Sequence, residues 1–144
     1  MRREQIVSGI TTGLIPTAAT LGMLIGFGVR LGSATRVLRT IGEMAFGGNF
    51  RGAVTAYVAA GALLHVIAVL SCGVAYVLIL GDDREHRVAS AIAVGGTVVI
   101  AATVAARTFA GSIALVLTPA NLIAIGVVIA ITLPIGMRLA LSRV

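Results

Sequence analysis

The sequence predicts an all-α integral membrane protein, with four transmembrane helices in one bundle and a short amphipathic helix at the membrane interface. The chain has 144 residues, of which 58% are hydrophobic and only 11% are charged; a soluble domain carries roughly 25% charged residues. No Asp, Glu, Lys or Arg lies between Arg51 and Asp82, or between Arg107 and Arg138. Each uncharged stretch exceeds the ~20 residues that a helix needs to cross about 30 Å of hydrocarbon.

The first span is expected over residues 6–29, and Pro16 inside it should kink the helix because proline removes one backbone hydrogen bond. Small side chains recur at every fourth position of this span and form a strip on one face. Another helix backbone can come close to such a strip and gain dispersion contacts. The predicted helix-packing residues are Ala18, Gly22, Gly26 and, in the third span, Gly95.

Residues 35–46 are too polar to span but have helical periodicity, with apolar side chains on one side and Arg36, Arg39 and Glu43 on the other. A short helix of this kind is typical of the interface plane, where Arg36 and Arg39 would bind lipid headgroups. The alternative interpretation is a polar loop with some helix content.

The remaining spans are expected over residues 53–80, 88–106 and 113–136, with Pro119 in the first third of the last one. The short charged turn after residue 80 forces the second and third spans into an antiparallel hairpin. Residues 1–144 therefore form a single polytopic domain, located in a cell membrane or a viral membrane. A cleaved signal peptide is not expected, because the apolar segment after Arg2 and Arg3 is too long and is interrupted by Pro16.

The orientation in the membrane cannot be assigned from the basic residues. All eleven are Arg, and four spans place six of them on one side and five on the other. The positive-inside rule therefore favours neither side. A partner that fixes the topology would explain this balance, and so would insertion in both orientations as an antiparallel dimer.

The only titratable side chain expected deep in the membrane is His65, near the middle of the second span. Its structural interpretation is an imidazole hydrogen-bonded to a carbonyl or a Thr of a neighbouring helix. The alternatives are a pore-lining or proton-relay group, with Thr118 and Asn121 as further candidate pore residues, or a haem ligand that would need a second ligand from another protomer or subunit.

These observations favour some function classes and exclude others. All five acidic residues map to termini or loops, which argues against ion-coupled transport and against intramembrane catalysis by paired aspartates. No enzyme activity, cofactor, metal or nucleic-acid partner is expected. The leading hypothesis is a structural or assembly subunit of a membrane complex, with lipids and other copies or membrane subunits as partners. A holin-like or channel-like passive pore is the alternative, and a haem-bearing membrane anchor through His65 comes third.

Overall fold

The computed structural model describes residues 3–47, 53–80, 85–109 and 116–141, and all regular structure within these ranges is helical. Four of the helices, α1, α3, α4 and α6, are long and apolar enough to cross a membrane. This confirms the predicted helical class, with four long apolar helices. The described helices are α1 (Arg3–Arg30), α2 (Arg36–Phe46), α3 (Val54–Leu80), α4 (Arg87–Phe109) and α6 (Pro119–Leu141).

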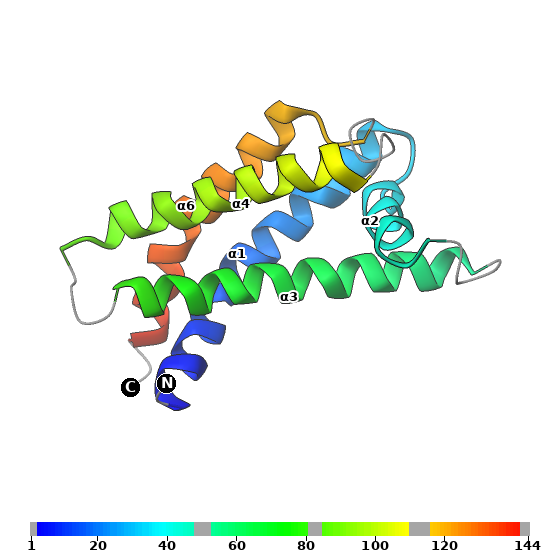
Figure 1. Cartoon of the computed structure of the whole chain (residues 1–144). Coiled ribbons are helices and arrows are strands. Elements are labelled where there is room, and N and C mark those ends of the chain that lie inside the picture. Colours follow the sequence, from blue (N-terminus) through cyan, green and yellow to red (C-terminus); the bar gives the residue numbers. More distant parts are fainter. Residues whose placement is uncertain (1–2, 48–52, 81–84, 110–115, 142–144) are drawn as a thin grey trace.

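The helices pack in a spatial order that differs from their order in the chain (Figure 1). Helix α1 crosses α3 on one side and α6 on the other, α2 packs on α3, and α4 packs on α6. Helices α3 and α4 follow one another in sequence and run antiparallel, yet they contact each other sparsely. The molecule therefore has two halves, α1–α2–α3 and α4–α6, which meet mainly along α1 and α6.

Glycines allow α1 and α3 to cross with their backbones in contact. A side chain on Gly73 of α3 would meet backbone atoms of Gly13 at 2.7 Å, and one on Gly9 would meet the Val74 backbone. Such a close approach is possible only where side chains are absent.

The crossing of α2 and α3 uses a reciprocal pair of glycines. A side chain on Gly42 would overlap the carbonyl group of Tyr57, and one on Gly61 would overlap the carbonyl group of Leu38. The Tyr57 hydroxyl also donates to the carbonyl of Gly47 at 2.8 Å, just beyond the end of α2. Helix α2 is therefore fixed across the beginning of α3.

The amphipathic pattern of α2 is explained by this packing. Val37 and Leu38 are buried, whereas Arg36 and Arg39 are exposed. The apolar side of α2 thus faces the bundle, and its charged side faces outward.

Pro16 lies inside α1, and the helix continues through it. Proline has no N–H to offer the carbonyl one turn earlier, which belongs to Thr12. Gly136 of α6 approaches this same carbonyl so closely that a Cβ would overlap it. The crossing of α1 and α6 therefore lies at the backbone group that Pro16 leaves without its helical donor.

The last long helix, α6, begins at Pro119 and not at the expected residue 113. Thr118 precedes it as the capping residue, and its Oγ1 accepts a hydrogen bond from the Asn121 N–H at 3.3 Å. Thr followed by Pro is a favoured start of a helix, since the cap satisfies an end donor and the first position needs no N–H. The expected position of Pro119 inside the span was wrong. Residues 110–115 lie outside the described residues.

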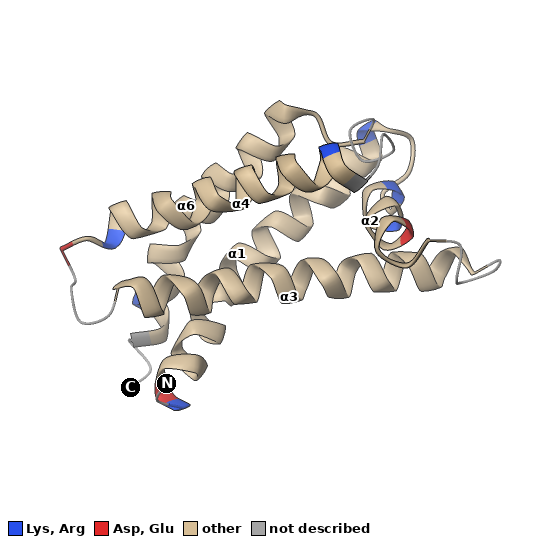
Figure 2. Ribbon diagram, viewed as in Figure 1, with Lys and Arg blue, Asp and Glu red and all other residues tan. Residues whose placement is uncertain are grey.

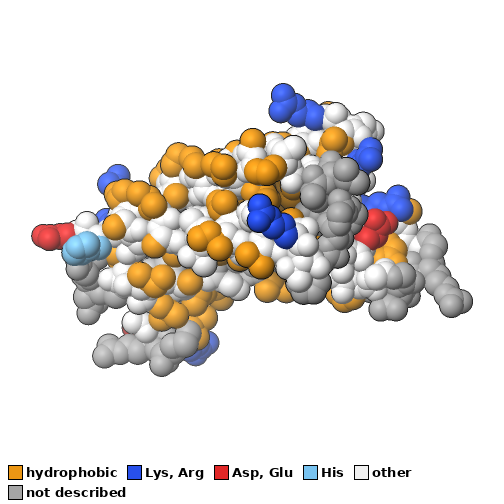
Figure 3. Space-filling view, turned by 45° about the horizontal axis from the view of Figure 1, so that its top comes forward, with side chains coloured by type: hydrophobic (Ala, Val, Ile, Leu, Met, Phe, Trp, Pro, Cys, Tyr) orange, Lys and Arg blue, Asp and Glu red, His pale blue; other side chains and the backbone are white. Residues whose placement is uncertain are grey.

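Charged side chains lie at the helix ends and on α2, as Figure 2 shows. Between their ends, the long helices expose large apolar side chains (Figure 3). Among these are Leu63, Ile100 and Ile131, which are 60% to 66% exposed. Exposure of this kind on several helices is unusual for a soluble monomer, whose largest apolar patch is roughly 300–600 Å².

Replacing Gly61 with Leu should destabilise the fold by about 3 kcal/mol, because the new side chain would force α2 away from α3. Gly96→Leu is the matched control, since a side chain at Gly96 would meet no atom within 4 Å. Unfolding by SDS titration in detergent micelles, followed by circular dichroism, measures both. Equal loss of stability in the two variants would contradict the glycine crossing.

Candidate functional site

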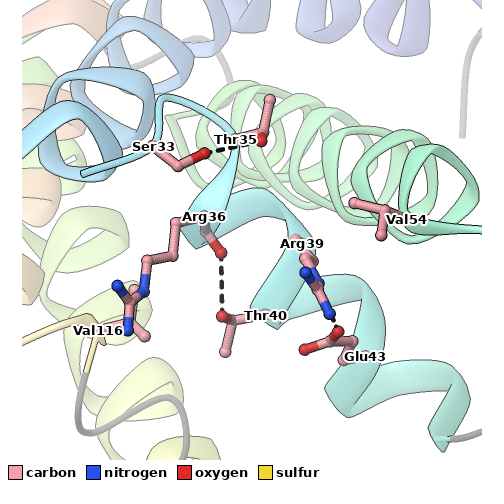
Figure 4. A pocket seen from close by; sticks show the side chains of 8 residues that line it. All are labelled: Ser33, Thr35, Arg36, Arg39, Thr40, Glu43, Val54 and Val116. Atoms are coloured by element: carbon pink, nitrogen blue, oxygen red, sulfur yellow. Dashed lines mark hydrogen bonds and ion pairs between the residues drawn. The ribbon is translucent and has the colours of Figure 1, made fainter. Parts of the chain in front are cut away.

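A polar pocket lies where α2 follows α1 and where α3 begins (Figure 4). Its volume is about 480 Å³. We call it the α2 pocket, and its lining residues are Ser33, Thr35, Arg36, Arg39, Thr40, Glu43, Val54 and Val116. The structure therefore brings Arg36 and Arg39, which the sequence predicts as headgroup ligands, into one pocket.

The two arginines of the α2 pocket are bound differently. Arg39 Nε donates to Glu43 Oε1 at 2.6 Å, one helical turn later. Arg36 instead directs Nη1 to the carbonyl of Leu31 at 2.9 Å, and Figure 4 shows its guanidinium extended toward Val116. Arg39 is paired with a carboxylate, whereas Arg36 has no carboxylate partner among the described residues.

A second cavity, of about 220 Å³, lies in the middle of the bundle and is lined by all five described helices. Its walls are almost entirely apolar, with Leu24 of α1, Met44 of α2, Val98 of α4 and Ile125 of α6 among them. His65 of α3 is the polar side chain at its edge. An apolar cavity larger than about 150 Å³ can hold a small apolar ligand and stay dry.

His65 is hydrogen-bonded to α1 through Thr20, with 2.9 Å between His65 Nε2 and Thr20 Oγ1. Thr20 Oγ1 also lies 2.7 Å from the carbonyl oxygen of Pro16, which can only accept a hydrogen bond. A hydroxyl has a single proton, so the arrangement that satisfies both contacts has Thr20 donating to Pro16 and His65 Nε2–H donating to Thr20. The imidazole therefore links α3 to α1, in agreement with the structural interpretation of this residue.

The geometry around His65 gives no support to a haem site. Its Nε2 is directed at Thr20, and the cavity of about 220 Å³ is smaller than the roughly 300–1,000 Å³ of pockets for drug-sized ligands. A haem is larger than such ligands.

Of the three candidate pore residues, His65 lines the cavity of about 220 Å³, whereas Thr118 and Asn121 are not part of its lining. Thr118 caps the first turn of α6 and is exposed. Asn121 is half-buried nearby, and the α6 side chains that reach the cavity of His65 are Leu122, Ile125 and Ile129.

The four predicted helix-packing residues divide into two groups. Gly95 of α4 packs inside the chain, because a side chain there would meet the carbonyl oxygen of Gly126 at 2.6 Å. Ala18, Gly22 and Gly26 are exposed on α1, and a side chain on either glycine would meet nothing within 4 Å. We call Ala18, Gly22 and Gly26 the α1 strip.

A crevice of about 300 Å³ lies between α3 and α4. It shares the lining residues Cys72 and Val98 with the cavity beside His65. The polar groups on its walls are turned to their own helices. Cys72 Sγ donates to the carbonyl of Ala68 at 3.2 Å, and Thr97 Oγ1 donates to the carbonyl of Ala93 at 2.8 Å. The crevice therefore presents an apolar surface.

Sequence reasoning missed the partner of His65 and most of the glycine contacts. Thr20 lies 45 residues before His65, and their pairing depends on how α1 crosses α3. The capping role of Thr118 could have been found, since Thr before Pro is a known start of a helix.

Comparisons with protein-family models, with curated proteins and with solved structures find no match to this chain. Within residues 3–47, 53–80, 85–109 and 116–141, no three His, Cys, Asp or Glu side chains form a group that could hold a metal ion. The functional argument therefore rests on the pockets and surfaces of the chain itself.

Two threonines of α1 should respond in opposite directions to the same substitution. Thr12 Oγ1 is buried and has no hydrogen-bond partner among the described residues. Such a group costs about 1–3 kcal/mol, so Thr12→Val should stabilise the protein by about 1 kcal/mol. Thr20→Val should destabilise it by roughly 0.6–1.7 kcal/mol, the range for hydrogen bonds between helices in membranes. SDS titration measures both changes. Destabilisation by Thr12→Val as large as that by Thr20→Val would contradict these hydrogen-bond assignments.

Proposed function

We propose that this chain is a multi-pass membrane protein that acts as a non-catalytic assembly subunit, joining a second copy of itself through the α1 strip. The membrane placement is supported by the four long apolar helices and by the position of the charged residues at helix ends and on α2. Most residues of these helices are not buried within the chain, which leaves their surfaces to lipid and to other subunits.

The observation that carries the assembly role is the contrast between the α1 strip and the other glycines. Nearly every other helical glycine of the described segments meets another part of the chain at close range, and Gly96 is the exception outside α1. Glycine destabilises a helix by about 1 kcal/mol relative to alanine. Gly22 and Gly26 bear this cost one turn apart, on a face where the described part of the chain places no atom within 4 Å of an added side chain.

The neighbouring side chains give the α1 strip the shape of a helix-packing surface. Leu14, Ile25 and Val29 are between 40% and 61% exposed and lie beside the small residues. Large side chains beside a groove of small ones can fit into the same groove of an identical helix. Small residues at a spacing of four are the usual contact of paired membrane helices, and a two-fold dimer uses the same patch on both subunits.

Replacing both Gly22 and Gly26 with Leu should disperse this assembly, because the added side chains separate the two α1 backbones. The dissociation constant of the dimer should rise by at least about tenfold, equivalent to ~1.4 kcal/mol. Native mass spectrometry over a range of protein concentrations in detergent measures the change. Gly96→Leu fills another open glycine position, on α4, and should leave the oligomer intact.

Cross-linking in liposomes tests the same contact without disturbing it. Cys72 is the single cysteine, so Cys72→Ala provides a background for one new cysteine at a time. Ala18→Cys should give a disulfide-linked dimer under mild oxidation, whereas Ile100→Cys, on the exposed face of α4, should not. A monomer at all concentrations, or equal cross-linking at both positions, would overturn the proposal.

A further inference from the structure

We propose that the α2 pocket binds the phosphate group of an anionic membrane lipid, with Arg36 as its main ligand. This inference rests on the membrane placement proposed above and does not depend on the contact at the α1 strip.

The N-terminus of α2 concentrates positive charge that nothing in the described chain offsets. A helix N-terminus carries about half a positive elementary charge. The first turn of α2 holds no acidic residue and begins with Arg36, and Thr35 makes no capping hydrogen bond through its side chain. A cation at this end is unfavourable, so an anion bound there would relieve the repulsion and accept hydrogen bonds from the end of the helix.

Arg36 is the arginine that remains available for such an anion. Glu43 neutralises Arg39, whereas no carboxylate among the described residues pairs with Arg36. The contact with the Leu31 carbonyl uses one N–H of Arg36, and no other side-chain hydrogen bond of Arg36 is formed within the described residues. A guanidinium binds phosphate with two parallel hydrogen bonds, which a single amine cannot make.

The hydroxyl groups of the α2 pocket add one further donor. Ser33 Oγ and Thr35 Oγ1 lie 3.2 Å apart, so one donates to the other and the second keeps its proton for a ligand. The Thr40 proton is used by the carbonyl of Arg36 at 3.0 Å. The free groups on this side of the pocket are therefore mainly donors, and the volume of about 480 Å³ falls within the roughly 300–1,000 Å³ of small-molecule sites.

The position of the pocket identifies a lipid as the source of the phosphate. Helix α1 ends at Arg30 and α3 begins at Val54, so the α2 pocket lies at one end of two long apolar helices. With these helices in a bilayer, that end reaches the headgroup level. Val54 and Val116 line the pocket beside the polar groups and offer contacts to the glycerol and the first carbons of an acyl chain.

Native mass spectrometry of the intact protein, with phosphatidylglycerol or phosphatidylcholine added, tests this site. The wild type should bind phosphatidylglycerol more tightly than phosphatidylcholine. Arg36→Gln should weaken phosphatidylglycerol binding roughly tenfold. Arg107→Gln removes the same charge from another exposed position and should change the binding little. Equal effects of the two variants would overturn the proposal.

A variant that is expected to strengthen lipid binding makes the test independent of misfolding, because a misfolded protein would lose binding and not gain it. Glu43→Gln releases Arg39 from its ion pair and should tighten phosphatidylglycerol binding several-fold. Unchanged or weaker binding in this variant, with the fold intact by circular dichroism, would count against the α2 pocket as the site.

Two further measurements identify the source of the phosphate and separate this proposal from the assembly role. Inorganic phosphate at equal concentration should not displace phosphatidylglycerol, and efficient displacement would assign the pocket to free phosphate instead. The Gly22→Leu, Gly26→Leu double variant should keep its lipid binding, whereas Arg36→Gln should keep its oligomeric state. Loss of both properties in either variant would contradict the independence of the two sites.

Discussion

Backbone contact at glycine is the constraint on which the arrangement of the helices depends. Glycine lies at each of four helix crossings, namely α1 with α3, α2 with α3, α4 with α6 and α1 with α6. At each crossing, a side chain on at least one of these glycines would overlap backbone atoms of the partner helix. In the membrane placement proposed above, apolar helices gain little by leaving lipid for one another, so close packing and weak contacts between Cα–H groups and carbonyls would hold them together. The fold therefore depends on the positions where side chains are missing.

The same constraint determines where the polar groups of the bundle lie. Gly42 and Gly61 fix α2 across the start of α3, with Val37 and Leu38 turned inward. The charged side of α2 must then face outward, and Arg36 and Arg39 share a pocket as a result. The contact between α1 and α3 likewise brings Thr20 to His65. The pocket and the buried hydrogen bond are both products of glycine packing.

The bounds of α1, α3 and α4 agree with the predicted bounds to within about three residues, because hydropathy is summed over about 20 residues and does not depend on neighbouring helices. The pairing of the helices could not be predicted in this way. Gly9 with Gly13 and Gly22 with Gly26 have the same spacing in one helix, yet the first pair packs on α3 and the second is open. A residue without a side chain carries no apolar or polar preference that could tell the two faces apart. The start of α6 was misplaced for another reason, since the apolar residues before Pro119 outweighed the local capping pattern.

The sparse contact between α3 and α4 has a mechanical consequence. The two halves of the molecule meet mainly where α1 crosses α6, and Thr12 lies against Gly136 at this crossing. A rotation of one half against the other would pivot about this crossing. It would widen or narrow the crevice between α3 and α4 that Cys72 lines. The crossings inside each half would stay unbroken during such a movement. Within the described residues, the Thr12 hydroxyl at this crossing has no hydrogen-bond partner, so it adds no directional bond that would resist such a rotation.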